Sequence, residues 1–73
     1  MKRFALKIDL PGSVAYFHVE DGDSVEEGDN VIAVECMKMN MDITAPVAGK
    51  VRFRVALGEM VEQGQVIAEI EQE

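Results

Sequence analysis

The chain has 73 residues, of which 48% are hydrophobic and 29% charged, and its formal net charge at pH 7 is -7. This length supports one small core and leaves no room for a second domain or an enclosed enzyme pocket, so we expect residues 1–73 to form a single domain. The acidic balance disfavours nucleic-acid binding through phosphate neutralisation, and no apolar run approaches the length of a membrane span.

Cysteine and histidine are too few for a metal site or for nucleophilic catalysis. Cys36 is the only cysteine and His18 the only histidine. They can form neither an intramolecular disulfide nor the ligand set of a structural zinc ion. No catalytic partner of His18 can be inferred, so we expect a structural histidine and no catalytic residue. We expect a reducing, cytoplasmic setting, or an organelle matrix if the domain belongs to a larger chain.

Short strands are the dominant local pattern. Apolar side chains alternate with others along residues 4–8, 14–17 and 51–55, which is the period of a β-strand. The parity of the second segment places Tyr16 and His18 on the side of Val14. Glycine and proline interrupt the chain at residues 11–12, 22, 28, 46, 49, 58 and 64. The runs between these breaks are too short for a stable helix, so we predict an all-β fold.

The sequence also contains an internal repeat. Residues 22–28 (GDSVEEG) match residues 58–64 (GEMVEQG). Earlier in the chain, residues 12–14 match residues 49–51 once the alignment is shifted by one residue. Two similar β halves predict a flattened barrel-sandwich of two antiparallel sheets, related by a pseudo-two-fold axis and built from about eight short strands.

The same alignment pairs Tyr16 with Phe53 and Glu35 with Glu71. The segment just after Glu35 in the first half is therefore the counterpart of the chain end in the second half. In a pseudo-two-fold pair of sheets, equivalent points lie at opposite ends. We therefore expect Lys38 to project from the end of the domain remote from both termini.

Residues 32–43 fit a β-hairpin with Met37-Lys38 as its two-residue turn. Cys36 then faces Met39, and one face of the hairpin is apolar, while the other carries Ala33, Glu35, Asn40 and Asp42. A three-residue loop would send matched side chains to opposite faces, but a turn at Lys38-Met39 keeps the parity, so two registers stay open. Tight turns favour glycine and asparagine, and non-glycine residues at positive φ cost about 1–3 kcal/mol each. We interpret the turn as one selected to present Lys38.

At these residues the sequence resembles the biotinyl/lipoyl attachment domains. The likeness runs from about Lys7 to Glu71 and includes Pro11-Gly12, the Gly22 and Gly28 turns, Glu35-Cys36-Met37-Lys38-Met39, Ala45-Pro46 and Gly49-Lys50-Val51. In biotin-bearing members the modified lysine lies between two methionines, whereas lipoyl-bearing members usually have an acidic residue before it and a small apolar one after it.

The resemblance therefore implies covalent biotin on Lys38. Met37 and Met39 would be flanks recognised by the modifying enzyme, and Glu35 and Cys36 the context of the motif. Cys36 stands where many biotinyl domains have alanine, and its small apolar side chain should change little. The segment between Tyr16 and Gly22 is too short for the protruding thumb of some family members, so the chain resembles the thumbless type.

A non-catalytic carrier is the function that this resemblance implies. A biotin protein ligase would attach biotin to Lys38, which would then carry carboxybiotin between a biotin carboxylase and a carboxyltransferase or decarboxylase. The nearest alternative is a lipoyl carrier, which would share the fold and the lysine. A further alternative is an interaction module whose Lys38 is never modified.

Overall fold

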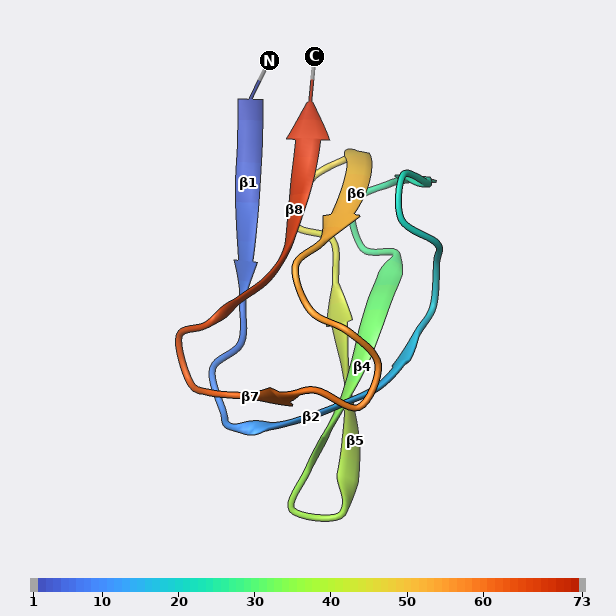
Figure 1. Cartoon of the computed structure of the whole chain (residues 1–73). Helices are drawn as coiled ribbons and strands as arrows, with labels where there is room; N and C mark the ends of the chain where they lie inside the picture. Colours follow the sequence, from blue (N-terminus) through green and yellow to red (C-terminus); the bar gives the residue numbers. More distant parts are fainter. Residues whose placement is uncertain (1, 73) are drawn as a thin grey trace.

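The computed structural model describes residues 2–72, which form eight strands in two antiparallel sheets of four strands each (Figure 1). The strands are β1 (Lys2–Lys7), β2 (Gly12–Phe17), β3 (Ser24–Val25), β4 (Asn30–Cys36), β5 (Met39–Thr44), β6 (Gly49–Phe53), β7 (Met60–Val61) and β8 (Val66–Gln72). The order is β1-β8-β6-β3 in the first sheet and β5-β4-β2-β7 in the second. The predicted all-β fold is confirmed, and the described residues include no helix that could span a membrane.

The two sheets correspond strand by strand, as the internal repeat predicts. The order of each sheet makes β1 equivalent to β5, β8 to β4, β6 to β2 and β3 to β7. The sheets bury one shared core between them, and its buried side chains are Leu6, Ile8, Val14, Val25, Val31, Ile32, Val34, Ala45, Val51, Val55, Val61, Ile67, Ala68 and Ile70. Aliphatic side chains fill this core, and the rings of Phe17 and Phe53 pack against it.

Gly12 and Gly49 show how closely the repeat follows the packing. A Cβ added at Gly12 would collide with the carbonyl oxygen of Glu35, and one added at Gly49 would collide with the carbonyl oxygen of Glu71. Each glycine opens a strand that lies against the neighbouring backbone. The repeated glycine therefore marks a close approach that the fold uses twice.

A β-bulge at Ala15 interrupts the repeat. Val14 pairs with Val34, but the next pair is Tyr16 with Ala33, so Ala15 has no partner on β4. The equivalent ladder between β6 and β8 runs without a break. The single residue of slippage in the sequence repeat is therefore the extra residue of this bulge.

The bulge corrects two sequence-based expectations. Phe17, and not Tyr16, is the counterpart of Phe53, because Phe17 pairs with the residue of β4 that matches the partner of Phe53. Tyr16 and His18 do not share the face of Val14: Val14 is buried, Tyr16 is exposed, and Phe17 packs on the core. An inserted residue moves every later side chain of a strand to the opposite face, which explains the reversal.

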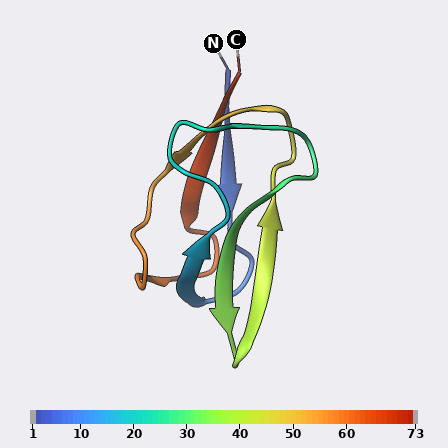
Figure 2. The ribbon, with the colours of Figure 1, turned by 90° about the vertical axis from the view of Figure 1, so that its right-hand side faces the viewer.

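The molecule is elongated, with extents of 36 × 19 × 18 Å. The outer ends of β1 and β8 pair at one end through Lys2 and Gln72, and the β4–β5 hairpin forms the opposite end (Figures 1 and 2). Lys38 lies at the tip of that hairpin. The expectation that Lys38 projects away from the chain ends is confirmed.

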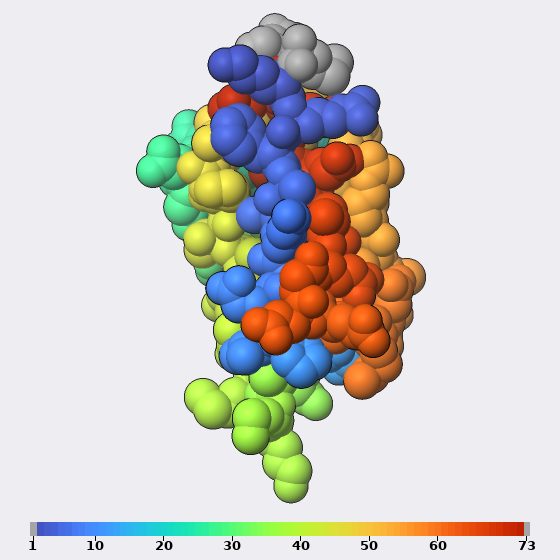
Figure 3. Space-filling model, turned by 90° about the vertical axis from the view of Figure 1, so that its left-hand side faces the viewer, coloured from blue at the N-terminus to red at the C-terminus, as the bar shows by residue number. Residues whose placement is uncertain are grey.

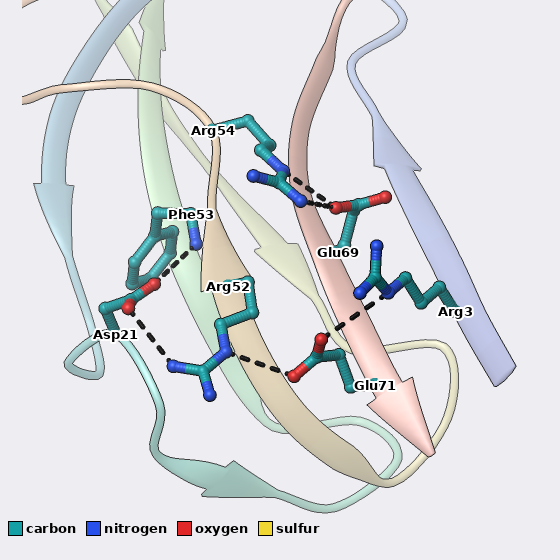
Figure 4. A network of polar contacts seen from close by, with 7 residues as sticks. All are labelled: Arg3, Asp21, Arg52, Phe53, Arg54, Glu69 and Glu71. Carbon is teal, nitrogen blue, oxygen red and sulfur yellow. Dashed lines mark hydrogen bonds and ion pairs between the residues drawn. The ribbon is translucent and has the colours of Figure 1, made fainter. Parts of the chain in front are cut away.

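Ion pairs cover the outer face of the first sheet, near the chain ends (Figure 4). The Arg52 guanidinium donates hydrogen bonds to Glu71 at 3.1 Å and to Asp21 at 3.4 Å, and Arg3 lies 3.5 Å from the other oxygen of Glu71. The hydrogen bond to Glu71 and the charge of that carboxylate raise the pKa of Arg52. These exposed pairs link β1, β8 and β6 at the end remote from Lys38, where each contributes little to stability by itself.

Candidate functional site

The β4–β5 hairpin ends in a two-residue turn formed by Met37 and Lys38. Cys36 pairs with Met39, and the φ angles of Met37 and Lys38 are 52° and 66°. Positive φ at both central residues is the pattern of a type I′ turn. The structure therefore places the turn at Met37-Lys38 and excludes the alternative register at Lys38-Met39.

A strongly anchored ladder holds this strained turn. Below Cys36 and Met39, β4 and β5 continue to pair through Glu35 with Asn40 and Val34 with Met41. Val34 is fully buried in the core. The two non-glycine residues at positive φ cost about 1–3 kcal/mol each, and a turn of this kind persists only where the surrounding structure overdetermines it. The hairpin thus fixes the backbone at Lys38 although its residues are poor turn formers.

Three consecutive side chains at the tip of the hairpin are exposed. Met37 is 90% exposed, Met39 is 70% exposed, and Lys38 is also exposed. Among residues 2–72, no hydrogen bond or ion pair engages the Lys38 amine. Cys36 is half-buried at the base of the turn. The amine is therefore accessible to another molecule.

The outer face of the second sheet differs in one respect from the expected pattern. Glu35, Asn40 and Asp42 are exposed, as predicted, but Ala33 is fully buried although it lies outside the core cluster. Ala33 pairs with Tyr16 on one side and with Asp42 on the other, so their side chains flank it. The expectation of a half-exposed Ala33 is wrong because side chains from both neighbouring strands cover it.

His18 connects those two neighbours. Its Nε2 lies 2.9 Å from Oδ1 of Asp42, and its ring meets the ring of Tyr16 edge-on at 4.8 Å between centroids. Since β4 lies between β2 and β5, this contact spans the face of β4 over Ala33. His18 therefore stabilises the sheet that presents the turn. The alternation of side chains in the sequence does not predict this cluster, because the bulge at Ala15 moves Tyr16 and His18 to the opposite face of the strand.

The chemistry of this site is that of one accessible primary amine. Such an amine can be acylated to an amide, and Lys38 and both of its neighbours in the chain are exposed. Residues 2–72 contain no group of three or more His, Cys, Asp or Glu side chains that could hold a metal ion. A covalently attached group with a carboxyl function fits this donor set, and Lys38 is the residue that would hold it.

Known proteins are similar to this chain in sequence and in fold. The family model described as "Biotin-requiring enzyme" matches residues 7–70. The dihydrolipoyllysine-residue acetyltransferase component of the pyruvate dehydrogenase complex of Mycoplasma capricolum is 43% identical over 61 residues, covering 82% of this chain and 14% of that protein. The homolog of biotinylated protein TB7.3 from Mycobacterium leprae is 33% identical over 66 residues, covering 89% of this chain and 93% of that protein.

Solved structures agree with this assignment of the fold. The urea carboxylase of Kluyveromyces lactis matches with a TM-score of 0.90 and 35% identity, over 97% of this chain and 6% of that one. The lipoyl domain of the 2-oxoglutarate dehydrogenase complex of Azotobacter vinelandii matches with a TM-score of 0.73 and 22% identity, over 85% of this chain and 80% of that one. The chain therefore spans a small part of the acetyltransferase and of the carboxylase, and most of the two small relatives.

Proposed function

The chain belongs to the family of biotin- and lipoyl-attachment domains, and on this premise we propose that it is a biotin carboxyl carrier whose Lys38 holds biotin through an amide bond. Domains of this family are non-catalytic carriers of a covalent biotin or lipoyl group within enzyme complexes. The finer assignment to biotin rests on the residues around Lys38.

The observation that carries the proposal is the pair of methionines at the tip. Met37 and Met39 flank Lys38 and are both highly exposed, so an enzyme that grips the turn meets them first. Flanking methionines are the pattern of the biotin-bearing members, whereas an acidic residue before the lysine is usual in lipoyl-bearing ones. The name of the biotinylated mycobacterial protein supports the same choice.

A lipoyl carrier is the second candidate, and one specific observation favours it. The relative that is 43% identical to this chain is an acetyltransferase component whose name specifies a dihydrolipoyllysine residue. The fold and the position of the lysine would serve either group equally well. The methionine flanks are local to the modified residue, so we give them more weight than identity spread over the whole domain.

In the proposed reaction, Nζ of Lys38 attacks the activated carboxyl carbon of the group to be attached. A C–N bond forms, the activating group leaves with the electron pair of its former bond to that carbon, and the amine loses a proton. Among residues 2–72, no base forms a hydrogen bond or ion pair with the amine, so the proton passes to the modifying enzyme or to water. The chain is therefore the substrate of this step, and its contribution is the rigid turn that holds the amine out.

After attachment, the chain's role is to present the group. Biotin supplies a ring that accepts and releases a carboxyl group when partner enzymes act on it. The β4–β5 hairpin fixes the point from which the side chain of Lys38 and its attached group extend. Tethering the group in this way gives it an effective concentration on the order of millimolar at nearby active sites. We propose a biotin protein ligase, a biotin carboxylase and a carboxyltransferase or decarboxylase as partners, in the cytoplasm or in an organelle matrix.

The choice between the two groups can be tested on the unmodified chain. It is incubated with biotin protein ligase, biotin and ATP, and separately with a lipoate ligase and its substrates, and the intact mass is measured. We expect one biotinyl group on the wild type and on a Lys50→Arg control, and none on Lys38→Arg. Lipoylation without biotinylation would assign the chain to the second candidate, and no modification by either enzyme would indicate an interaction module.

A further inference from the structure

The second half of the chain places two exposed apolar side chains beside the β4–β5 hairpin. Met60 on β7 is 74% exposed, and Leu57 in the loop before it is 64% exposed. Val61, the strand neighbour of Met60, is buried, so Met60 points out of the second sheet. We call Leu57 and Met60 the shoulder.

The shoulder shares a face with the hairpin that carries Lys38. Met60 pairs with Ser13, Ser13 with Glu35, and Glu35 with Asn40, which makes one row across all four strands of the second sheet. Adjacent strands lie about 4.8 Å apart, so Met60 is about 10 Å from Glu35 along this row. Only the Cys36–Met39 pair separates the row from the turn. In Figure 3, the orange segment lies above the protruding yellow-green hairpin and to its right, with blue atoms directly over the hairpin.

The pseudo-two-fold symmetry provides an internal comparison for these positions. Met60 is equivalent to Ser24, and Leu57 to Asp21. The backbones match closely: the Gly58 amide donates to the Val14 carbonyl at 2.9 Å, as the Gly22 amide donates to the Val51 carbonyl at 2.7 Å. The fold therefore accepts a carboxylate and a hydroxyl, those of Asp21 and Ser24, at these equivalent positions. It does not require the two large apolar side chains that stand at the Lys38 end.

Charge is also divided between the two sheets. Lys38 is the only lysine or arginine of the second sheet and its hairpin, since the others lie on β1 or on and just after β6: Lys2, Arg3, Lys7, Lys50, Arg52 and Arg54. Glu59 and Glu62 lie next to the shoulder in the chain, Glu35 lies two strands away in the same row, and all three are exposed. A partner that fits this surface has an apolar patch flanked by basic side chains.

We propose that Leu57 and Met60 form a docking surface for the enzyme that acylates Lys38. This inference rests on the proposed acylation of Lys38, but it does not depend on which group is attached. An unmodified lysine is short, so its amine reaches a reacting carbon only if the body of the domain closes on the enzyme. The shoulder is an exposed apolar surface beside the tip that such an approach would cover, and its two apolar anchors would hold the amine in place.

The test exchanges the residues of the two ends. The double variant Leu57→Asp with Met60→Ser places at the Lys38 end the residues that the fold already carries at the equivalent positions. With biotin protein ligase at saturating biotin and ATP, we expect KM for the double variant to rise by about tenfold, a typical loss for interface anchors, while kcat stays within about twofold. The control Ser24→Met adds an exposed methionine at the other end and should leave both constants unchanged.

Two further measurements separate docking from other causes. Circular dichroism melts should show the double variant folded, and the milder Met60→Gln, which keeps the side-chain length, should raise KM in the same direction. An unchanged KM for the folded double variant would overturn the docking surface and leave the proposed function standing. If the wild type accepts only a lipoyl group, the biotin assignment fails, and the same KM comparison with lipoate ligase still decides on the shoulder.

Discussion

The rings of Phe17 and Phe53 lie 4.3 Å apart with an interplanar angle of 40°, and the two residues occupy equivalent positions in the two halves of the chain. Both rings are half-buried and pack on the core. Because the two rings touch, the pseudo-two-fold relation between the halves is visible as a direct contact. It also fixes the register of the bulge, because Phe17 reaches Phe53 only if Ala15 is the extra residue.

Loss of either ring should therefore destabilise the domain. We predict that Phe17→Ala and Phe53→Ala each lower the free energy of unfolding by about 2–4 kcal/mol, through lost burial and a lost ring contact. Tyr16→Ala removes an exposed ring and should cost less than about 1 kcal/mol. Urea denaturation followed by circular dichroism measures all three. A Tyr16→Ala cost equal to that of Phe17→Ala would contradict the bulge assignment.

The glycines at the close approach of the strands should be equally sensitive. Gly12→Ala and Gly49→Ala each force a Cβ against a backbone carbonyl oxygen, and we expect each to cost about 2–3 kcal/mol. Ser13→Ala, the next position on β2, should be nearly neutral. Thermal unfolding of the three variants would show the difference, and a Gly12→Ala variant as stable as the wild type would speak against the described packing.

The turn offers a case in which stability and function should move in opposite directions. Met37→Asn places a residue that tolerates positive φ at the first turn position, and we predict a gain of about 0.5–1 kcal/mol in the free energy of unfolding. The same change removes a flank of Lys38 and should slow biotinylation. Met39→Asn, on a strand, should slow biotinylation without the gain. If Met37→Asn is both more stable and as good a substrate, the methionine flank has no role in recognition.

The ion pairs at the other end should matter for stability alone. Arg52→Gln removes the partner of Glu71 and Asp21, so the melting temperature should fall at low salt, and the difference should shrink in about 1 M salt because ions screen exposed charges. The rate of Lys38 modification should not change. A slower modification at equal stability would show that this remote face also contacts the modifying enzyme.

Much of this structure could be predicted from the sequence because its signals are local and repeated. Parity alone reduced the hairpin at Lys38 to two registers, and the positive φ of Met37 and Lys38 then selects one. The slippage of the repeat indicates one extra residue between Val14 and Gly22, but only the strand pairing shows that this residue is Ala15. The burial of Ala33 depends on side chains from two other strands, which no local pattern contains.

The pattern of alternating residues does not predict the shoulder, for a different reason. Met60 and Leu57 differ in character from Ser24 and Asp21, and this difference is present in the repeat. It gains meaning only when the structure shows that Met60 shares a row with Glu35 beside the hairpin. A comparison of the two halves, position by position, is the sequence signal that could have found it.

The most direct test of the account is to locate the attached group on the chain. After reaction with biotin protein ligase, biotin and ATP, the protein is digested and the modified peptide is sequenced by tandem mass spectrometry. We predict a biotinyl group on the side chain of Lys38 and on no other lysine. A Lys38 left bare by an active ligase, or found carrying only a lipoyl group, would contradict the proposal that this hairpin presents biotin.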